Sequence, residues 1–195
     1  MSLSKLRIAA LVSFVVALVT LIVGGFFARG SLSPYPGEVA DQSGQVLFTK
    51  ADILEGQDVY QRYGLMDHGS VWGHGSQRGA EFSAASLHLM GLVVADQTAR
   101  SQYGQPYAQL GEEQKALVDV RVKREIKANR YDSSRDRLTL TPAQVAALAA
   151  VVDHWDRTFA AGDPEYGFLP NTVKTGSERT QVGRFFFWTA WVAGT

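Results

Sequence analysis

The sequence predicts a mainly α-helical protein: an N-terminal transmembrane helix carries an extracytoplasmic helical domain with one small β-hairpin, and a second transmembrane helix begins at the end. Three observations support this. Residues 8–28 form an uncharged apolar run, cap signals and apolar residues at helical spacing recur between residues 49 and 159, and residues 185–195 are apolar and aromatic. We therefore divide the chain into an anchor (1–29), an extracytoplasmic domain (30–183) and the start of a second transmembrane helix (184–195).

The N-terminal run, IAALVSFVVALVTLIVGGFFA, is long enough to cross a bilayer. At about 1.5 Å per residue it spans a hydrocarbon core of about 30 Å. Lys5 and Arg7 precede it, so the positive-inside rule places the N-terminus in the cytoplasm and the domain on the periplasmic side of an inner membrane. A cleaved signal peptide is the alternative, but the run is longer than a usual signal-peptide core, which favours a permanent anchor.

The C-terminal run follows Arg184 and reads FFFWTAWVAGT. Aromatic residues beside a basic residue are typical of a membrane interface. As a helix this run reaches only about 16 Å, half a bilayer, and its last carbonyls would be unpaired in lipid. We therefore expect the native chain to continue beyond it or to meet a partner there. The alternative is an amphipathic tail packed on the soluble domain.

The domain begins with a hairpin and a capped helix. Val39 and Val46 flank the turn residues 41–44, which indicates two short strands. The segment 49–52, Thr-Lys-Ala-Asp, has the form of a capping box and predicts a helix that reaches about Tyr63.

Three further helices are expected. One begins near Phe82, and the next runs from about Gly111 to Asn129. Residues 138–140 form a short extended lead-in to the last, where Thr141 caps, Pro142 takes the first helical position and Gln144 completes a capping box. The apolar stripe of that helix comprises Val145, Leu148, Val152, Trp155 and Phe159.

Composition excludes several functions. The chain has 195 residues, a formal net charge of zero and no cysteine. Neutrality argues against nucleic acid or anionic lipid as the main partner, because either favours a basic excess. Without cysteine the chain cannot form disulfides, thiolate metal sites, iron–sulfur clusters or covalent c-type haem.

A short motif resembles class I cytochromes c, which place a Gly-x-x-(Val/Leu)-aromatic helix before a Cys-x-x-Cys-His turn. Here residues 56–60 read Gly-Gln-Asp-Val-Tyr, and residues 64–68 read Gly-Leu-Met-Asp-His. Gly64 and Asp67 stand where the cysteines would be, and His68 stands at the haem-ligand position. The resemblance implies a cytochrome-c-like helical fold that holds no covalent haem.

A longer segment, YGLMDHGSVWGHGS at residues 63–76, resembles the (Y/H)-G-(S/T)-(V/I)-x-G-H-G segment of quinol-dependent nitric oxide reductases. Residues 44–50, 129–131 and 185–191 also resemble that family. The resemblance implies denitrification chemistry: two NO become N2O and water with electrons from quinol. It also implies haem b, haem b3 and a non-haem iron in a catalytic transmembrane part, which is either a partner subunit or the continuation of this chain.

The same resemblance implies a metal contact. In relatives the glycine-rich segment reaches a calcium ion between the two haems, where a backbone carbonyl and a tyrosine serve as ligands. Gly75 and Gln77 are the matching positions, and Gln77 departs from the tyrosine pattern. An amide oxygen is nevertheless a hard ligand suited to calcium. The alternative is a glycine-rich turn that simply packs on the membrane part.

We predict no catalytic and no cofactor-binding residue in this chain, which alone would be inert. The four histidines, His68, His74, His88 and His154, do not form a recognisable ligand set, and His154 is expected to be solvated. No carboxylate pair forms an acid/base motif. Two other functions stay open: the front end of a nitric oxide dismutase, and a stand-alone membrane-anchored docking protein.

Overall fold

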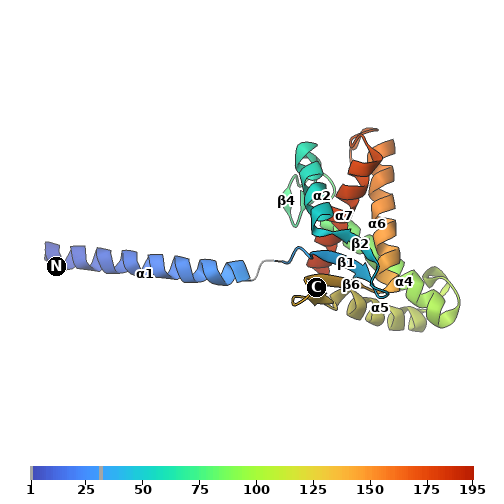
Figure 1. Cartoon of the computed structure of the whole chain (residues 1–195), viewed down its shortest axis with the longest axis horizontal. Helices are drawn as coiled ribbons and strands as arrows, with labels where there is room; N and C mark the ends of the chain where they lie inside the picture. Colours follow the sequence, from blue (N-terminus) through green and yellow to red (C-terminus); the bar gives the residue numbers. More distant parts are fainter. Residues whose placement is uncertain (1, 31–32) are drawn as a thin grey trace. The chain divides into compact units, whose positions relative to one another are not determined.

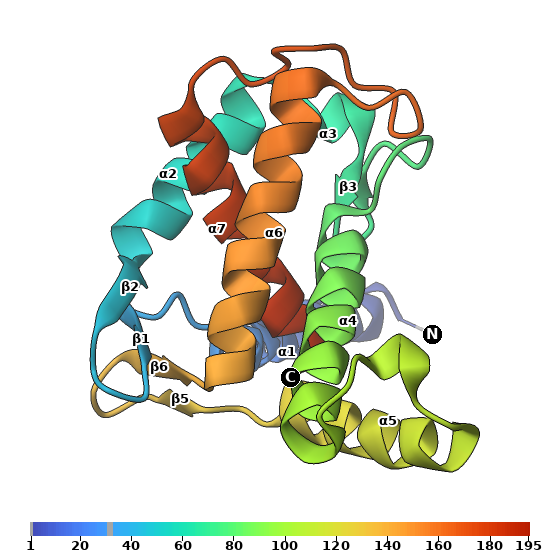
Figure 2. The ribbon, with the colours of Figure 1, turned by 90° about the vertical axis from the view of Figure 1, so that its right-hand side faces the viewer.

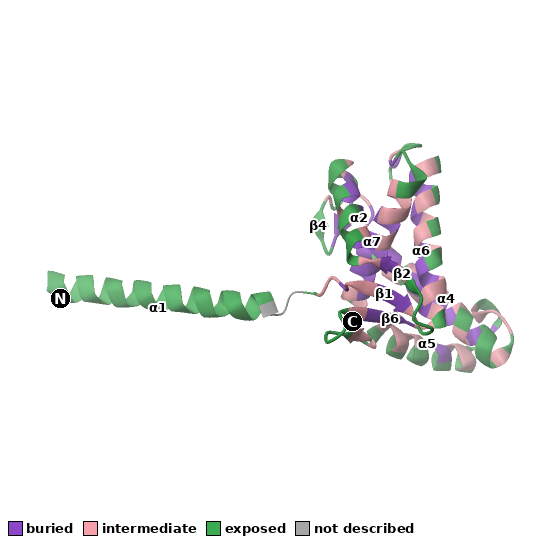
Figure 3. Ribbon diagram, in the orientation of Figure 1, coloured by how far each residue is buried: buried purple, intermediate pink, exposed green. Residues whose placement is uncertain are grey.

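The computed structural model describes residues 2–30 and 33–195 and divides the chain into two units, residues 1–34 and 35–195. The first unit contains helix α1 (Leu3–Gly30), which is exposed along its length (Figure 3). Within the described residues, α1 alone is long and apolar enough to cross a membrane, with a mean hydropathy of 2.6. This finding is compatible with the predicted anchor.

The second unit is a helical domain with a small sheet (Figure 1). Its elements are β1 (Glu38–Asp41), β2 (Val46–Thr49), α2 (Lys50–Arg62), α3 (Leu65–His68), β3 (Ser70–Val71), β4 (His74–Gly75), α4 (Phe82–Tyr103), the 3-10 helix η1 (Tyr107–Gln109), α5 (Glu112–Lys127), β5 (Tyr131–Asp132), β6 (Arg137–Leu140), α6 (Pro142–Ala161) and α7 (Gly176–Gly194). The mainly α-helical fold class is confirmed.

Local cap signals fix where the helices begin. Asp52 accepts the Thr49 backbone N–H at 2.7 Å at the start of α2, and Thr141 accepts the Gln144 N–H at 3.3 Å at the start of α6. The hairpin is confirmed as β1 and β2. It belongs to a four-stranded sheet of order β2-β1-β6-β5, in which β1 and β6 run parallel.

Helix α7 lies in the middle of the domain and packs against α2, α4 and α6 (Figure 2). Its residues 185–191 are all buried, with exposed fractions of 4% or less. The prediction that a transmembrane helix begins at residue 184 is therefore wrong, because the helix begins at Gly176 and turns its aromatic residues into the domain core, as the alternative of a packed tail held. Aromatic composition indicates removal from water, and here protein rather than lipid provides the apolar surroundings.

Stacked aromatic rings fill the core between these helices. Phe82 stacks on Phe186 with 4.5 Å between ring centroids, and Trp155 lies 5.2 Å from both rings. Trp155 donates its Nε1–H to the buried Ser86 hydroxyl at 2.9 Å, so its polar group is satisfied. The cluster extends through Phe168 to His68, 5.6 Å away. Rings thus occupy the interior beside the position that corresponds to the haem ligand.

Candidate functional site

The segment that resembled nitric oxide reductases, residues 63–76, runs from α3 into a loop. We call the loop, residues 69–81, the glycine hairpin; its residues 72–75, 77 and 78 are exposed. Strands β3 and β4 pair antiparallel, with Val71 opposite His74. Trp72 and Gly73 form the two-residue turn between them, with φ angles of 52° and 75°. Two positive φ angles are typical of a type I′ hairpin turn. Tryptophan rarely adopts this conformation, so surrounding contacts must hold it there.

Trp72 fixes the tip of the hairpin to the core. Its indole Nε1–H donates to the Thr189 carbonyl of α7 at 3.0 Å, and its backbone N–H donates to the Ser83 hydroxyl at 3.1 Å. Its ring meets the Trp188 ring edge-on at 5.5 Å. Trp72 is still 42% exposed, so the hairpin is both held in place and available for contact.

Glu81 holds the other end of the hairpin. Its carboxylate accepts the Ala84 backbone N–H at the N-terminus of α4 and the Gly73 N–H at 3.4 Å. One side chain therefore caps a long helix and fixes the turn. Exposed positions between these anchors include His74, Gln77 and Arg78.

The glycines of the hairpin are required by its own packing. A Cβ atom at Gly75 would overlap the Gly69 carbonyl oxygen and lie 3.0 Å from the Met66 carbonyl oxygen, and φ at Gly75 is +134°. A Cβ atom at Gly79 would overlap the His68 carbonyl oxygen. A side chain at Gly75 would thus disrupt the hairpin whether or not an ion lies near it, so intolerance at this position cannot identify an ion.

Gly75 and Gln77, the predicted calcium ligands, are both exposed on this hairpin. Together they supply at most three oxygen atoms, whereas calcium takes six to eight. No group of three or more His, Asp, Glu or Cys residues suited to a metal occurs within residues 2–30 and 33–195. The two residues therefore do not form a calcium site by themselves, and most ligands would have to come from outside the domain.

The histidines lie apart. His68, His74 and His88 are exposed. His154 is half-buried against Trp155, with 4.7 Å between ring centroids, so the expectation that it is solvated is wrong. Burial lowers the pKa of His154, and the nearby charge of Arg157 lowers it further. A neutral imidazole is favoured because the charged form would lose hydration.

Sequence reasoning missed the Tyr60 hydroxyl. Tyr60 is 6% exposed, and its hydroxyl has no hydrogen-bond partner among the described residues. Burial raises the pKa of Tyr60, and the negative charges of Glu81 and Asp67 add to the effect. The cytochrome-like motif marked this aromatic position but gave no sign that its polar atom would be unpaired.

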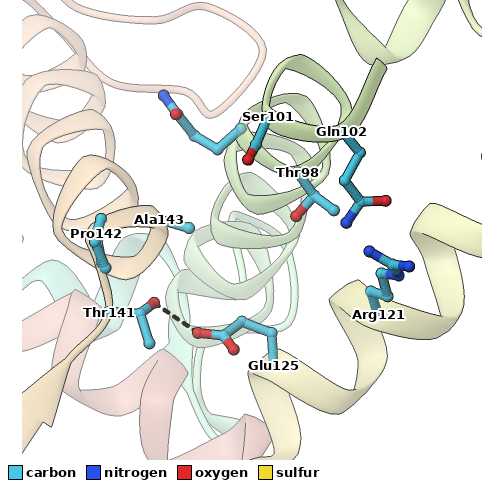
Figure 4. Close-up of a pocket in the computed structure, with 9 residues that line it drawn as sticks. Thr98, Ser101, Gln102, Arg121, Glu125, Thr141, Pro142 and Ala143 are labelled. Atoms are coloured by element: carbon cyan, nitrogen blue, oxygen red, sulfur yellow. Dashed lines mark hydrogen bonds between the residues drawn. The ribbon is translucent and has the colours of Figure 1, made fainter. Parts of the chain in front are cut away.

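A polar cavity of about 430 Å³ lies between α4, α5 and the start of α6 (Figure 4). Glu125 lines it, accepts the Thr141 hydroxyl at 2.6 Å and forms an ion pair with Arg130 at 2.7 Å. These contacts join α5 to α6. Arg121 and Gln102 stand at the opposite edge (Figure 4). Because Glu125 is used structurally, the cavity contains no acid/base pair.

One comparison with known proteins shows the family of the chain. A search of curated proteins finds no match. The family model for the cytochrome c-like domain of the nitric oxide reductase NorB matches residues 36–195. The matched region covers every element from β1 to α7 and includes the glycine hairpin. The chain belongs to the family of NorB cytochrome c-like domains of nitric oxide reductase.

Proposed function

We propose that this domain docks on the catalytic part of a quinol-dependent nitric oxide reductase through the glycine hairpin, and that it orients and seals that part rather than carrying electrons. Quinol delivers its electrons from within the membrane, so this domain needs no haem. A covering loop that excludes water strengthens the interactions of charges beneath it. The observation that carries the proposal is a hairpin fixed to the core by Trp72 and Glu81 and exposed between them.

Charge reversal at the hairpin tests the docking role in the assembled membrane enzyme. We expect Arg78→Glu to weaken retention of the catalytic part and to lower NO turnover, because Arg78 is exposed on the hairpin. Arg135→Glu is the matched control. Arg135 is exposed on the β5–β6 turn, which lies away from the β3–β4 hairpin in both Figure 1 and Figure 2. Equal assembly and turnover in both variants would refute docking through this hairpin.

The gas products separate the two enzymatic alternatives. A reductase converts NO to N2O, whereas a dismutase would yield N2 and O2 from NO without quinol. A stand-alone docking protein would copurify with no haem-containing membrane part. We favour the reductase because the family match names it.

The calcium contact is a second part of the proposal. We propose that the Gly75 carbonyl and the Gln77 amide oxygen face a calcium ion whose other ligands belong to the catalytic part. Gln77→Ala is the informative variant, because Gln77 is exposed and its truncation leaves the hairpin packing intact. Metal analysis of the assembled enzyme should show less calcium in this variant. Unchanged calcium content would remove Gln77 from the ligand set.

A further inference from the structure

A groove of about 370 Å³ lies between α4, α5 and the C-terminal end of α7. We call it the α5–α7 groove. Its floor is formed by Leu87, Val122 and Ile126, which are partly exposed, and its end by Ala193 and Gly194. The volume is within the usual range for small-molecule sites, and the floor is aliphatic. An extended hydrocarbon segment fits such a floor because apolar surface is then removed from water.

Two cations stand on the rim. Lys123 and Lys127 line the groove one helical turn apart on α5, and both are exposed. Neither ammonium group takes part in any ion pair recorded between described residues. The acidic residue on the rim, Asp119, accepts the Tyr107 hydroxyl at 2.7 Å. The rim therefore carries two positive charges against one negative charge, that of Asp119.

The groove lies near the first residue of the domain. Tyr35, the first residue of the domain, stacks on Trp188 with 4.1 Å between ring centroids. From Trp188 to Gly194 the helix advances only about 9 Å. Gly194 is in close contact with the floor, because a Cβ atom there would lie 2.8 Å from Ile126. Helix α1 of the same chain is long and apolar enough to cross a bilayer, which makes membrane lipid an available ligand.

We infer that the α5–α7 groove binds an anionic phospholipid of the bilayer, with an acyl segment on the apolar floor and the phosphate between Lys123 and Lys127. The zero net charge of the whole chain conceals a local excess on α5. Residues 119–127 include Arg121, Lys123, Arg124 and Lys127 against Asp119 and Glu125, and Glu125 is paired with Arg130. Free phosphate would satisfy only the rim. A neutral lipid would gain little from the two lysines.

The test uses the full chain purified in a neutral detergent, with retained lipid counted by native mass spectrometry after addition of phosphatidylglycerol, phosphatidylcholine or inorganic phosphate. We expect one phosphatidylglycerol to be retained, and retention to fall about tenfold in Lys123→Gln/Lys127→Gln. Arg121→Gln/Arg124→Gln is the matched control, because it removes the same charge from the same helix outside the groove and should retain the lipid. Lipid around α1 is common to all variants.

A variant of the floor tests the acyl contact. Ala193→Glu places a charge in the groove at an exposed position, so the fold should survive, as circular dichroism can verify. Phosphatidylglycerol retention should fall in this variant too. Four outcomes would each overturn the assignment. The chain could retain phosphatidylcholine or inorganic phosphate as well as it retains phosphatidylglycerol. The two charge variants could lose phosphatidylglycerol equally, or Ala193→Glu could retain it fully.

Discussion

Asp52 joins the first helix of the domain to the last. One carboxylate oxygen accepts the Thr49 N–H at 2.7 Å and the Thr49 hydroxyl at 2.9 Å, which completes the capping box of α2. The other oxygen accepts Arg184 at 2.7 Å and Gln181 at 3.0 Å, both from α7. Burial opposes ionisation of Asp52, but these hydrogen bonds and the charge of Arg184 lower its pKa overall.

We expect Asp52→Asn to lower the free energy of unfolding by about 1–3 kcal/mol at pH 7, because an amide replaces a charged acceptor. A lowered pKa contributes stability that is present above the unfolded pKa of about 3.9 and is lost as pH falls through the folded pKa. The variant should therefore lose less stability than the wild type below about pH 4. Urea unfolding at pH 7 and pH 3 measures both effects. Asp58→Asn, at an exposed site on the same helix, is the control. If the free energy of unfolding depends on pH in the same way in the wild type and in Asp52→Asn, Asp52 does not stabilise the fold through its charge.

Gly56 lets α2 and α7 approach closely. A Cβ atom there would overlap the Gln181 carbonyl oxygen and lie 2.7 Å from the Phe185 Cβ. We expect Gly56→Ala to cost about 1–3 kcal/mol through overpacking. Gly91→Ala in α4 is the control, because its new methyl group would meet nothing within 4 Å beyond its chain neighbours and the adjacent backbone of its own helix. This variant should be neutral or stabilising. Thermal unfolding of both variants tests this contrast, and equal midpoints would mean that α2 and α7 can separate at little cost.

The order of the glycine hairpin depends on the indole ring of Trp72. Trp72→Phe retains an aromatic ring but removes the N–H that donates to Thr189. We expect amide exchange of residues 70–76 to accelerate about fivefold to tenfold, with little change in global stability, because a net hydrogen bond contributes about 1 kcal/mol. His74→Ala, at an exposed hairpin position, should exchange like the wild type. If Trp72→Phe also exchanges like the wild type, other contacts hold the hairpin.

The sequence could predict the helices and strands whose ends are set by residues close together in the chain. The capping boxes at Thr49 and Thr141 are complete within four residues, so the starts of α2 and α6 follow from short segments. The parallel pairing of β1 with β6 joins segments about 100 residues apart, and no local pattern encodes it. The environment of α7 also could not be read from its aromatic run, because burial in protein and burial in lipid favour the same residues.

The sequence predicted which segment forms the candidate site, but it did not predict how the side chains of that segment are arranged. The resemblance identified residues 63–76, yet the indole contact with Thr189 depends on α7, which lies more than 100 residues later. The unpaired Tyr60 hydroxyl likewise depends on rings from α4 and α7 that surround it. Tertiary neighbours decide both features.

At the scale of the whole molecule, residues 35–195 form a unit with their own core. We expect this fragment, expressed without residues 1–34, to fold cooperatively in water, because its buried aromatic cluster lies entirely within it. Circular dichroism and a single unfolding transition in urea are the measurements. Aggregation of the fragment, or a non-cooperative transition, would show that the N-terminal residues contribute to the fold.

The position of α7 in the chain has a consequence for biosynthesis. Rings that β2, α2, α4 and α6 turn inward pack against residues 185–191. When the chain has emerged from the ribosome only as far as Thr175, the helices outside have shared apolar faces that are still open to water. Until α7 emerges and packs into the core, the domain stays incompletely folded, in a state that chaperones and proteases can recognise.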